Sequence, residues 1–467
     1  MPSTTALLGD RGCNGQPEIT LVRRFSRACS RNCLLFPCFS WVGWDTVEAE
    51  DPKMLKRLFA SIVKTGTLTL TTPGERTARI GAGQPELGIR FHDRRGPREL
   101  ATNPELKLGE LYMDGRITVE NGDIADLLDL LMHNLSLSPP RGVLWLTQAW
   151  RWVTRPLAQR NYSTRARKNV AHHYDLSGRL YDVFLDRDRQ YSCAYFSAPD
   201  ETLEEAQIGK KRHIAAKLFL DRPNLSVLDI GSGWGGLALD LARDCGARVL
   251  GVTLSEEQIA LSRTRAQKAG LAERCRFELV DYRALNGTFD RIVSVGMFEH
   301  VGVPYYQAFF DKLRALLKDD GVALLHTIGR SDGPGVTNSW IAKYIFPGGY
   351  TPALSEVLPI IEQSGLIVSD IEVLRLHYAE TLKEWRRRFK AQWNTVAELY
   401  DERFCRMWEF YLAGAEMGFR RDGLAIYQIQ LTKRIETLPL TRDYMFEMER
   451  TMRFAGTQTM PRTVRAA

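Results

Sequence analysis

The stretch Val227-Leu-Asp-Ile-Gly-Ser-Gly-Trp-Gly-Gly-Leu-Ala-Leu239 decides the fold of this chain. Its apolar beginning is typical of a buried strand and its end is typical of a helix start, so a glycine-rich turn joins the two. Glycine has no side chain, which lets the backbone turn sharply and approach a ligand closely. We therefore expect ligand contacts at Gly231 and Gly233, and at Gly235 or Gly236.

Outward from this turn, short β-branched segments alternate with helical segments from about residue 200 onward. This alternation indicates an α/β fold, in which crossover helices connect the strands of a parallel sheet. We predict a Rossmann-like, doubly wound domain with a seven-stranded, mostly parallel sheet and helical lid insertions. The predicted strands are Ser226–Ile230, Arg248–Val252, Arg276–Val280, Phe289–Val295, Gly321–Thr327, Leu366–Leu374 and Leu424–Leu431.

The glycine turn alone would also fit a dinucleotide-binding protein. Two details oppose NAD, because Asp229 lies inside the motif and the second strand runs into Gly251-Val-Thr-Leu-Ser without the acidic residue that a ribose needs. Asp281 follows the third strand, where its carboxylate is placed to accept a hydrogen bond from an adenine amine. Tyr282 beside it is placed to stack on the ring, and an ordinary cap is the alternative role for Asp281.

Changes in composition along the chain indicate its division into domains and connecting segments. Residues 1–44 hold four of the eight cysteines without a helical or strand period, so we expect a poorly ordered extension. We expect a smaller N-terminal α+β domain at 45–140, a basic, Trp-rich linker at 141–170, the ligand-binding domain at 171–440 and a C-terminal tail at 441–467. The linker either lies in the headgroup region of a bilayer or packs as an interdomain helix.

The bulk composition narrows the classes of function. A net charge of +7 favours weak attraction to anionic surfaces, which include both nucleic acid and phospholipid headgroups. No segment approaches the roughly 18 consecutive apolar residues of a spanning helix. The cysteines form no Cys-x-x-Cys pair, so we expect no metal site and a reducing cytoplasm.

Several further motifs follow one another along the chain, and with them the sequence resembles the class I methyltransferases. The resemblance is greatest to the cyclopropane-fatty-acyl-phospholipid synthases, a family that includes the mycolic acid cyclopropane synthases. It covers about 165–435, and more loosely 50–165. The motifs are His172-His-Tyr-Asp-Leu-Ser, Tyr191-Ser-Cys-Ala-Tyr-Phe, Thr202-Leu-Glu-Glu-Ala-Gln, Gly251-Val-Thr-Leu-Ser-Glu-Glu-Gln, Phe289-Asp-Arg-Ile-Val-Ser-Val-Gly-Met-Phe-Glu-His-Val-Gly and His326-Thr-Ile-Gly.

The resemblance implies that S-adenosyl-L-methionine (SAM) is the cofactor and that a set of strand-end and loop residues contacts it. These residues are Tyr191, Ser192, Asp229, Gly231, Gly233, Gly235, Gly236, Thr253, Leu254, Ser255, Gln258, Asp281 and Tyr282.

Methylation of an unactivated alkene leaves a carbocation, so the pocket must exclude water, and closing the ring needs a base for one proton. The resemblance implies a bound bicarbonate ion as this base. Its ligands would be the catalytic residues Cys193, Glu299, His326 and Tyr378, together with the backbone amide of Ile328.

Each of these residues also has an ordinary structural interpretation, for example a buried cysteine that only packs or a glutamate that caps a helix. Glu299 and His326, however, both lie at the carboxyl ends of predicted parallel strands, which is where such sheets bind ligands. Their joint occurrence favours a functional role. The aromatic residues of 340–350 and those around Trp385, Trp393 and 408–411 would line an acyl channel or form ordinary core.

The sequence thus predicts transfer of a methylene unit from SAM to the cis double bond of an acyl chain in membrane phospholipid, forming a cyclopropane fatty acid. The alternative is methylation of an unsaturated acyl chain or another lipid without ring closure. A lipid-surface or nucleic-acid-modifying protein of the same fold is a third interpretation. Nucleic acid is disfavoured because the Asn/Asp-Pro-Pro-Tyr and catalytic-cysteine motifs of base methyltransferases are missing.

We expect a cytoplasmic enzyme that associates peripherally with the inner face of the membrane through basic and aromatic surface in 50–165. The resemblance implies a homodimer.

Overall fold

The computed structural model describes residues 53–74, 76–137 and 178–452. All of them belong to one compact unit, Ala49–Ala467. The predicted extension at 1–44 and the predicted linker at 141–170 lie outside the described residues. Among the described helices, none is long and apolar enough to cross a membrane.

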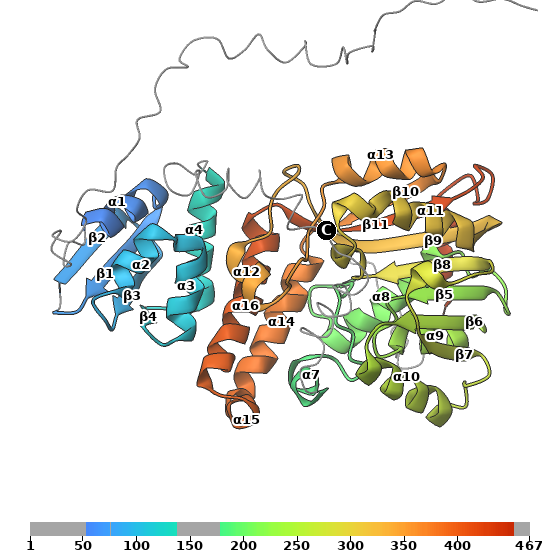
Figure 1. The fold of residues 1–467 in the computed structure, drawn as a ribbon, viewed down its shortest axis with the longest axis horizontal. Coiled ribbons are helices and arrows are strands. Elements are labelled where there is room, and N and C mark those ends of the chain that lie inside the picture. The colour runs from blue at the N-terminus through green and yellow to red at the C-terminus, as the bar shows by residue number, and fades with distance from the viewer. Residues whose placement is uncertain (1–52, 75, 138–177, 453–467) are drawn as a thin grey trace, which may run out of the picture. The chain divides into compact units, whose positions relative to one another are not determined.

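The first described part, residues 53–137, is a small α+β domain, as predicted (Figure 1). Its four-stranded sheet has the order β2-β1-β3-β4, in which only the β1–β3 pair is parallel. The elements are α1 (Lys53–Ile62), β1 (Gly66–Thr72), β2 (Arg76–Ala82), β3 (Glu86–Phe91), α2 (Gly96–Thr102), α3 (Pro104–Met113), β4 (Ile117–Glu120) and α4 (Ile124–Leu137).

Local chemistry explains where these helices start. Asn103 caps α3 by accepting a hydrogen bond from the Leu106 amide, and Pro104 occupies the first turn, where its missing N–H costs nothing. Helix α1 buries Leu55, Phe59 and Ile62 at helical spacing and leaves its basic residues in solvent.

The second described part contains a seven-stranded sheet of order β10-β11-β9-β8-β5-β6-β7. The five strands β5 to β9 pair in parallel, and β11 runs antiparallel to both β9 and β10. The strands are β5 (Ser226–Ile230), β6 (Arg248–Thr253), β7 (Cys275–Leu279), β8 (Phe289–Val295), β9 (Leu317–Arg330), β10 (Ile367–Leu374) and β11 (Leu424–Thr432). The predicted α/β fold with a mostly parallel, seven-stranded sheet is confirmed.

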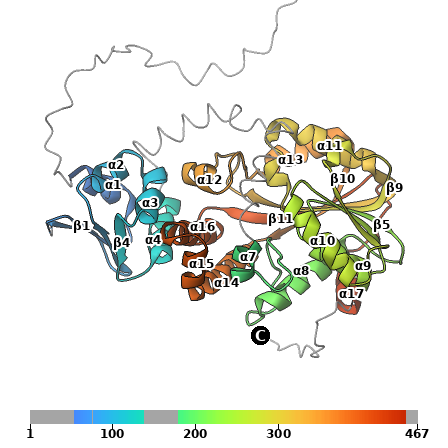
Figure 2. The ribbon, with the colours of Figure 1, turned by 60° about the horizontal axis from the view of Figure 1, so that its bottom comes forward.

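Helices cover both faces of this sheet (Figure 2). Successive strand residues point to opposite faces, so Leu228 and Ile292 pack with α11 and α13, whereas Val227 and Val293 pack with α8 and α9. The helices that flank the sheet are α8 (Leu203–Lys217), α9 (Gly236–Asp244), α10 (Glu256–Lys268), α11 (Tyr306–Leu316), α13 (Leu354–Ser364) and α17 (Asp443–Thr451).

Helix α17 differs from the predicted tail at 441–467. Its contacts are with α8, where Glu449 meets the buried His213, and with β10, where Arg442 pairs with Asp370 at 3.1 Å. These partners lie far away in the sequence, which explains why the local pattern did not reveal a helix.

Helical insertions form a further layer, namely α7 (Gly178–Phe184), α12 (Ser339–Tyr344), α14 (His377–Ala391), α15 (Trp393–Leu399) and α16 (Glu402–Arg421). They enclose a core of large aromatic side chains that includes Trp340, Trp385 and Trp408. The N-terminal domain contacts this layer directly, because Tyr112 of α3 donates a 2.6 Å hydrogen bond to Glu409 of α16.

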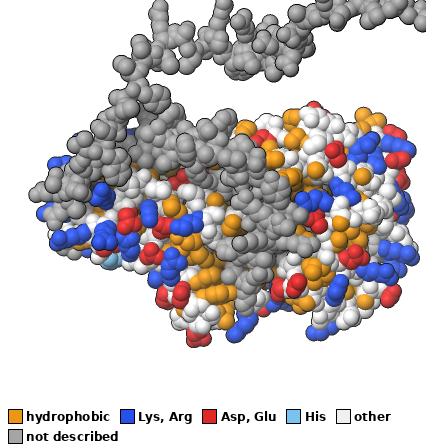
Figure 3. Space-filling view, viewed as in Figure 1, with side chains coloured by type: hydrophobic (Ala, Val, Ile, Leu, Met, Phe, Trp, Pro, Cys, Tyr) orange, Lys and Arg blue, Asp and Glu red, His pale blue; other side chains and the backbone are white. Residues whose placement is uncertain are grey.

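The described surface carries charges of both signs. On the face drawn in Figure 3, Lys and Arg side chains alternate with Asp and Glu side chains over both described parts.

Candidate active site

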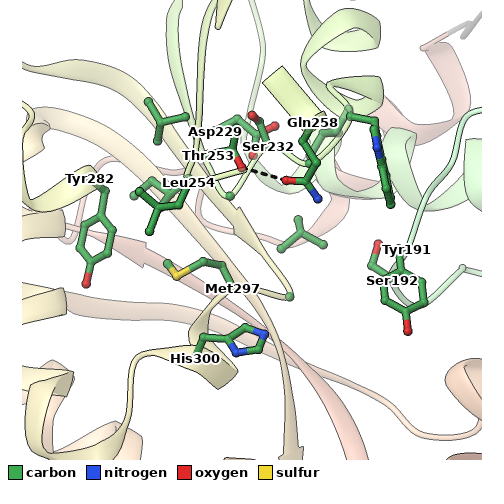
Figure 4. A pocket seen from close by; sticks show the side chains of 18 of the residues that line it. Tyr191, Ser192, Asp229, Ser232, Thr253, Leu254, Gln258, Tyr282, Met297 and His300 are labelled. Carbon is green, nitrogen blue, oxygen red and sulfur yellow. Dashed lines mark hydrogen bonds between the residues drawn. The ribbon is translucent and has the colours of Figure 1, made fainter. Parts of the chain in front are cut away.

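A pocket opens at the carboxyl ends of β5, β6 and β8, the edge at which parallel α/β sheets bind ligands. Ten of the thirteen predicted cofactor residues line it (Figure 4). They are Tyr191, Ser192, Asp229, Gly231, Gly233, Thr253, Leu254, Gln258, Asp281 and Tyr282.

The glycine turn after β5 has the conformation that its sequence requires. Gly231, Gly233 and Gly235 have φ angles of +84°, +54° and +81°, in the left-handed region that favours glycine. Gly231 and Gly233 line the pocket, and a Cβ atom at Gly231 would lie 2.9 Å from Met297 Cβ. Gly235 and Gly236 do not line the pocket and instead begin α9, where Gly236 packs against Asp188 and Gln190.

The loop after β6 forms a second wall of the pocket. Thr253 donates a 2.8 Å hydrogen bond to Gln258, which Figure 4 shows as a dashed line. Ser255, a predicted contact residue, does not line the pocket, since its side chain caps α10 by accepting from the Gln258 amide. Ser255 thus orders the loop that presents Thr253 and Leu254.

One end of the pocket is formed by Asp281 and Tyr282. Asp281 caps the 3-10 turn Tyr282–Ala284, and its carboxylate accepts two hydrogen bonds from the Arg283 guanidinium at 2.9 and 2.5 Å. Asp281 therefore has the capping role that was its alternative interpretation, and it also lines the pocket. Burial raises the pKa of Tyr282 to about 12, which keeps this ring neutral and suited to stacking on a base.

The opposite side of the pocket carries Tyr191 and Ser192 (Figure 4). Beneath them lies Lys210 of α8, which is 1% exposed and donates to Ser192 Oγ at 2.9 Å. Asp229 is also buried, and its Oδ2 has no partner among the described residues. Burial raises the pKa of Asp229 to about 7, and the charge of Lys210 partly opposes this shift.

The lining residues that were not predicted include Arg189, Lys210, Met297 and His300. The sequence spacing could have predicted Lys210 as a lining residue, because Lys210 follows the motif residue Gln207 by three positions and so lies on the same helix face. His300 stood inside a quoted motif next to Glu299. Burial lowers the pKa of His300 to about 4, so its imidazole is neutral.

The predicted base-site residues do not line this pocket, and all of them except the partly buried Ile328 are buried. Cys193 is 1% exposed, its thiol donates to the Ala194 carbonyl, and burial raises its pKa well above the usual range. It is therefore a neutral thiol and not a nucleophile. The Ala194 amide donates to Thr381 at 3.0 Å, which holds this segment against α14, the helix of Tyr378.

Glu299 lies in the 3-10 turn Phe298–His300 after β8, and His326 lies in β9. Glu299 Oε1 accepts a 2.6 Å hydrogen bond from the Ile328 amide. This differs from the expectation that the Ile328 amide is open to an anion.

Both Glu299 and His326 keep one buried polar atom without a partner among the described residues, Oε2 and Nε2. Gln428 donates to His326 Nδ1 at 3.1 Å, so the imidazole proton resides on Nε2. Burial lowers the pKa of His326 to about 3 and raises the pKa of Glu299 to about 7. The two side chains thus offer one neutral N–H donor and one carboxyl acceptor.

Aromatic rings surround the Tyr191 side of the site. Tyr191 stacks on Trp385 with ring centroids 5.2 Å apart, and its hydroxyl contacts that of Tyr411 at 2.9 Å. The predicted lid segment contributes Phe346, which packs on His300 and Tyr411, and Tyr350, whose amide donates to the Glu299 carbonyl. Such a wall excludes water from its interior.

The fold and the pocket define a class I, SAM-dependent methyltransferase. Comparison with family models narrows the class, since residues 161–429 match the mycolic acid cyclopropane synthetase family and residues 54–137 match a domain family of unknown function. The chain belongs to the mycolic acid cyclopropane synthetase family.

Individual relatives agree with this assignment. The chain is 37% identical to the "Probable fatty acid methyltransferase" of Pseudomonas putida over 74% of this chain and 88% of the relative. It is 36% identical to the cyclopropane-fatty-acyl-phospholipid synthase of Escherichia coli K12 over 71% of this chain and 84% of the relative. A crystal structure of the mycolic acid cyclopropane synthase CmaA1 complexed with SAH and CTAB is similar with a TM-score of 0.54 and 34% identity, over 57% of this chain and 97% of that chain.

Proposed function

We propose that this enzyme transfers a methylene unit from SAM to the cis double bond of an unsaturated acyl chain in membrane phospholipid and forms a cyclopropane fatty acid. The observation that carries the proposal is that Glu299, in the turn after β8, and His326, in the neighbouring strand β9, each keep one buried polar atom without a partner among the described residues. Burying such atoms without a partner costs free energy, so their presence suits a site built to receive a polar ligand.

Bicarbonate fits these atoms by its donor and acceptor chemistry. His326 Nε2–H is suited to donate to an oxyanion, and Glu299 Oε2 is suited to accept from the bicarbonate hydroxyl. When bound, bicarbonate supplies a base for the proton that ring closure releases. In this proposal Cys193 and Tyr378 border the ion, and Ile328 acts indirectly by orienting Glu299.

The protein's own part in the reaction is positioning and exclusion of water. Ring formation adds the SAM methyl carbon to the double bond and removes one proton, so the lipid gains CH2 and SAM becomes S-adenosylhomocysteine (SAH). The electron-rich faces of Tyr191 and Trp385 are suited to stabilise the positive charge of the carbocation. Aromatic side chains that exclude water protect this carbocation from capture by water.

The substrate class is supported by the relatives and by one surface of the chain. The Escherichia coli relative is named for fatty acyl chains of phospholipids. Helix α1 exposes Lys53, Lys56 and Arg57 beside Met54, whose side chain is 49% exposed. A basic helix of this kind suits an anionic headgroup surface. We propose a homodimer that works at the cytoplasmic face of the membrane.

Methylation of the acyl chain without ring closure is the second candidate. It is favoured by the Pseudomonas putida relative, which is named a fatty acid methyltransferase and is as similar to this chain as the cyclopropane synthase is. The two candidates share the methyl transfer and differ only in where the proton is lost.

The substrate class can be tested with purified protein, SAM and vesicles of dioleoyl phosphatidylglycerol, compared with free oleic acid at equal acyl concentration. We expect SAH release and a mass gain of one CH2 in the vesicle lipid, at a rate at least about tenfold above that with the free acid. A faster reaction with the free acid would contradict the phospholipid assignment. No reaction with either lipid would contradict an acyl substrate.

A further inference from the structure

The SAM pocket has a buried lysine whose role the cofactor motifs do not explain. Lys210 lies on α8, is 1% exposed and lines the pocket at the side of Tyr191 and Ser192. Its Nζ donates to Gln190 Oε1 at 2.6 Å and to Ser192 Oγ at 2.9 Å. An ammonium group has three N–H donors, and the described residues supply acceptors for two of them.

The hydrogen bond with Lys210 restricts the direction of the Ser192 hydroxyl hydrogen. An ammonium cannot accept a hydrogen bond, so Ser192 accepts from Lys210 and must direct its own O–H elsewhere. The described residues give the Ser192 hydroxyl no acceptor, and the residue lines the pocket. Lys210 in its ammonium form and Ser192 therefore present two donors to the ligand group at this end of the pocket.

The position of these donors is rigid. Gln207, one helical turn before Lys210, donates through Nε2 to the backbone carbonyls of Gln190 and Ser192 at 3.2 and 3.0 Å. Helix α8 thus holds the 190–192 segment by its side chains as well as by the lysine. A group pre-organised in this way loses little entropy when a ligand binds.

The other charged residues of the pocket are already paired. Arg189 forms two hydrogen bonds with Asp182, and Arg283 forms two with Asp281. Within the described part of the chain, Lys210 and Asp229 are the charged lining residues that form no ion pair. They are one basic and one acidic side chain, and burial moves the pKa of each to about 7, so the carboxylate and the ammonium of a bound amino acid would stabilise their charged forms.

Tyr282 and Ser192 lie on opposite sides of the pocket (Figure 4). An adenine at the Tyr282 side leaves the Ser192 side to the methionine part of SAM. We propose that Lys210, acting together with Ser192, recognises the methionine carboxylate and makes the pocket selective for ligands that carry it. This inference rests on the assignment of the pocket to SAM.

Its test is a binding comparison between two ligands that differ by one group. SAH carries the carboxylate, and decarboxylated SAH keeps the nucleoside, the sulfur and the amine without it. Isothermal titration calorimetry should show that the parent enzyme binds SAH about 10- to 100-fold more tightly than it binds decarboxylated SAH, as expected for a charged hydrogen bond. In Lys210→Met the SAH affinity should fall by that factor and the affinity for the decarboxylated ligand should stay within about threefold.

Two further variants separate this role from a structural one. Lys210→Arg keeps the charge and should retain most of the selectivity, whereas Lys268→Met removes an exposed lysine from α10 and should change neither affinity. If Lys210→Met weakens both ligands equally, the lysine is structural and the inference is wrong. Should Lys210→Met not fold, Ser192→Ala provides the same comparison, and an unchanged ligand ratio in it would overturn the inference.

The result for the parent enzyme also distinguishes a failure of carboxylate recognition from a failure of the assignment of the pocket to SAM. Equal affinity for the two ligands would overturn carboxylate recognition while leaving the SAM pocket intact. Failure to bind either ligand would instead contradict the SAM assignment itself.

Discussion

At the scale of single residues, Glu299 and His326 each hold one polar atom in the interior without a partner among the described residues. Residues that serve only to pack a core seldom keep such atoms, because desolvation is then uncompensated. The proposal assigns these atoms to the orientation of the base and leaves SAM binding to the separate pocket. Variants at Glu299 should therefore separate turnover from cofactor affinity.

We expect Glu299→Gln to lower kcat by about 100-fold or more, since general acid–base groups contribute about 10²–10⁴. Its dissociation constant for SAH should stay within about threefold of the parent value, because Glu299 does not line the SAM pocket. Steady-state kinetics and calorimetry measure the two quantities. Glu362→Gln, at an exposed position on α13, is the matched control. Equal loss of turnover and SAH affinity would refute the assignment of Glu299.

The burial of Glu299 also predicts a dependence of stability on pH. Burial raises its pKa to about 7 in the folded chain, from 4.5 for an ordinary glutamate. Between these values the folded state keeps a proton that the unfolded state has lost, so the free energy of unfolding falls as the pH rises from 4.5 to 7.

Glu299→Gln has no proton to lose at this position. Relative to the parent it should gain at most about 3 kcal/mol of unfolding free energy between pH 5 and pH 8. Urea unfolding at several pH values measures this difference. The same pH dependence in both proteins would show that Glu299 is not buried as an acid in the folded chain.

Residue-scale chemistry was partly predictable from the sequence. The motifs that carry the family resemblance placed ten cofactor residues around one pocket. They did not reveal that the Ile328 amide donates to Glu299, because that hydrogen bond joins β9 to the 3-10 turn after β8, 29 positions away in the sequence. Ser255 and Gly236 were predicted as contacts from their place in a motif, whereas in the structure both residues lie at helix starts.

At the scale of elements, α12 links the N-terminal domain to the cover of the site. Glu110 of α3 accepts hydrogen bonds from Lys343 and Tyr344 of α12 at 2.6 and 2.8 Å. The chain then continues into Phe346 and Tyr350, which contact His300 and Glu299. The small domain thus restrains a lid segment that reaches the proposed base site.

Removing this restraint should loosen the lid without disturbing the SAM pocket. In Glu110→Ala we expect faster hydrogen exchange in α12 and 345–350, together with a several-fold lower turnover and an unchanged affinity for SAH. Mass-spectrometric hydrogen exchange locates the effect. Glu86→Ala, which removes the exposed ion pair with Arg79, is the control. Exchange rates in α12 that do not change would argue against this coupling.

The elements of the sheet were predictable because buried parallel strands appear as short β-branched runs. All seven predicted strands are present, although β9 begins at Leu317, four residues before the predicted start. Helix α17 was missed because it buries Met445 alone and depends on polar contacts with α8 and β10. The local sequence pattern therefore predicted the strands of the sheet. It did not predict α17, because this helix depends on tertiary contacts.

At the scale of the whole molecule, the described chain begins with a helix that belongs to the core of the small domain. Leu55, Phe59 and Ile62 of α1 are buried against that domain. A chain that starts at Met54 retains these side chains and every described contact of the SAM pocket. We expect it to be soluble and to keep kcat within about threefold, since surface changes away from such features are usually small.

Activity assays and thermal unfolding of the shortened chain provide this test, with the full chain as reference. Insoluble protein, or loss of most of the turnover, would show that residues before Met54 take part in folding or catalysis.

Ring closure and simple methylation differ in the fate of the transferred methyl group. The most direct measurement uses purified enzyme, SAM with a deuterated methyl group and oleoyl phospholipid vesicles, followed by mass spectrometry of the acyl chain. We expect an acyl chain that has gained CH2 with two deuterium atoms retained, because the base removes one deuterium from the new methyl group. Retention of all three deuterium atoms would contradict ring closure and would instead identify a methyltransferase that loses its proton elsewhere.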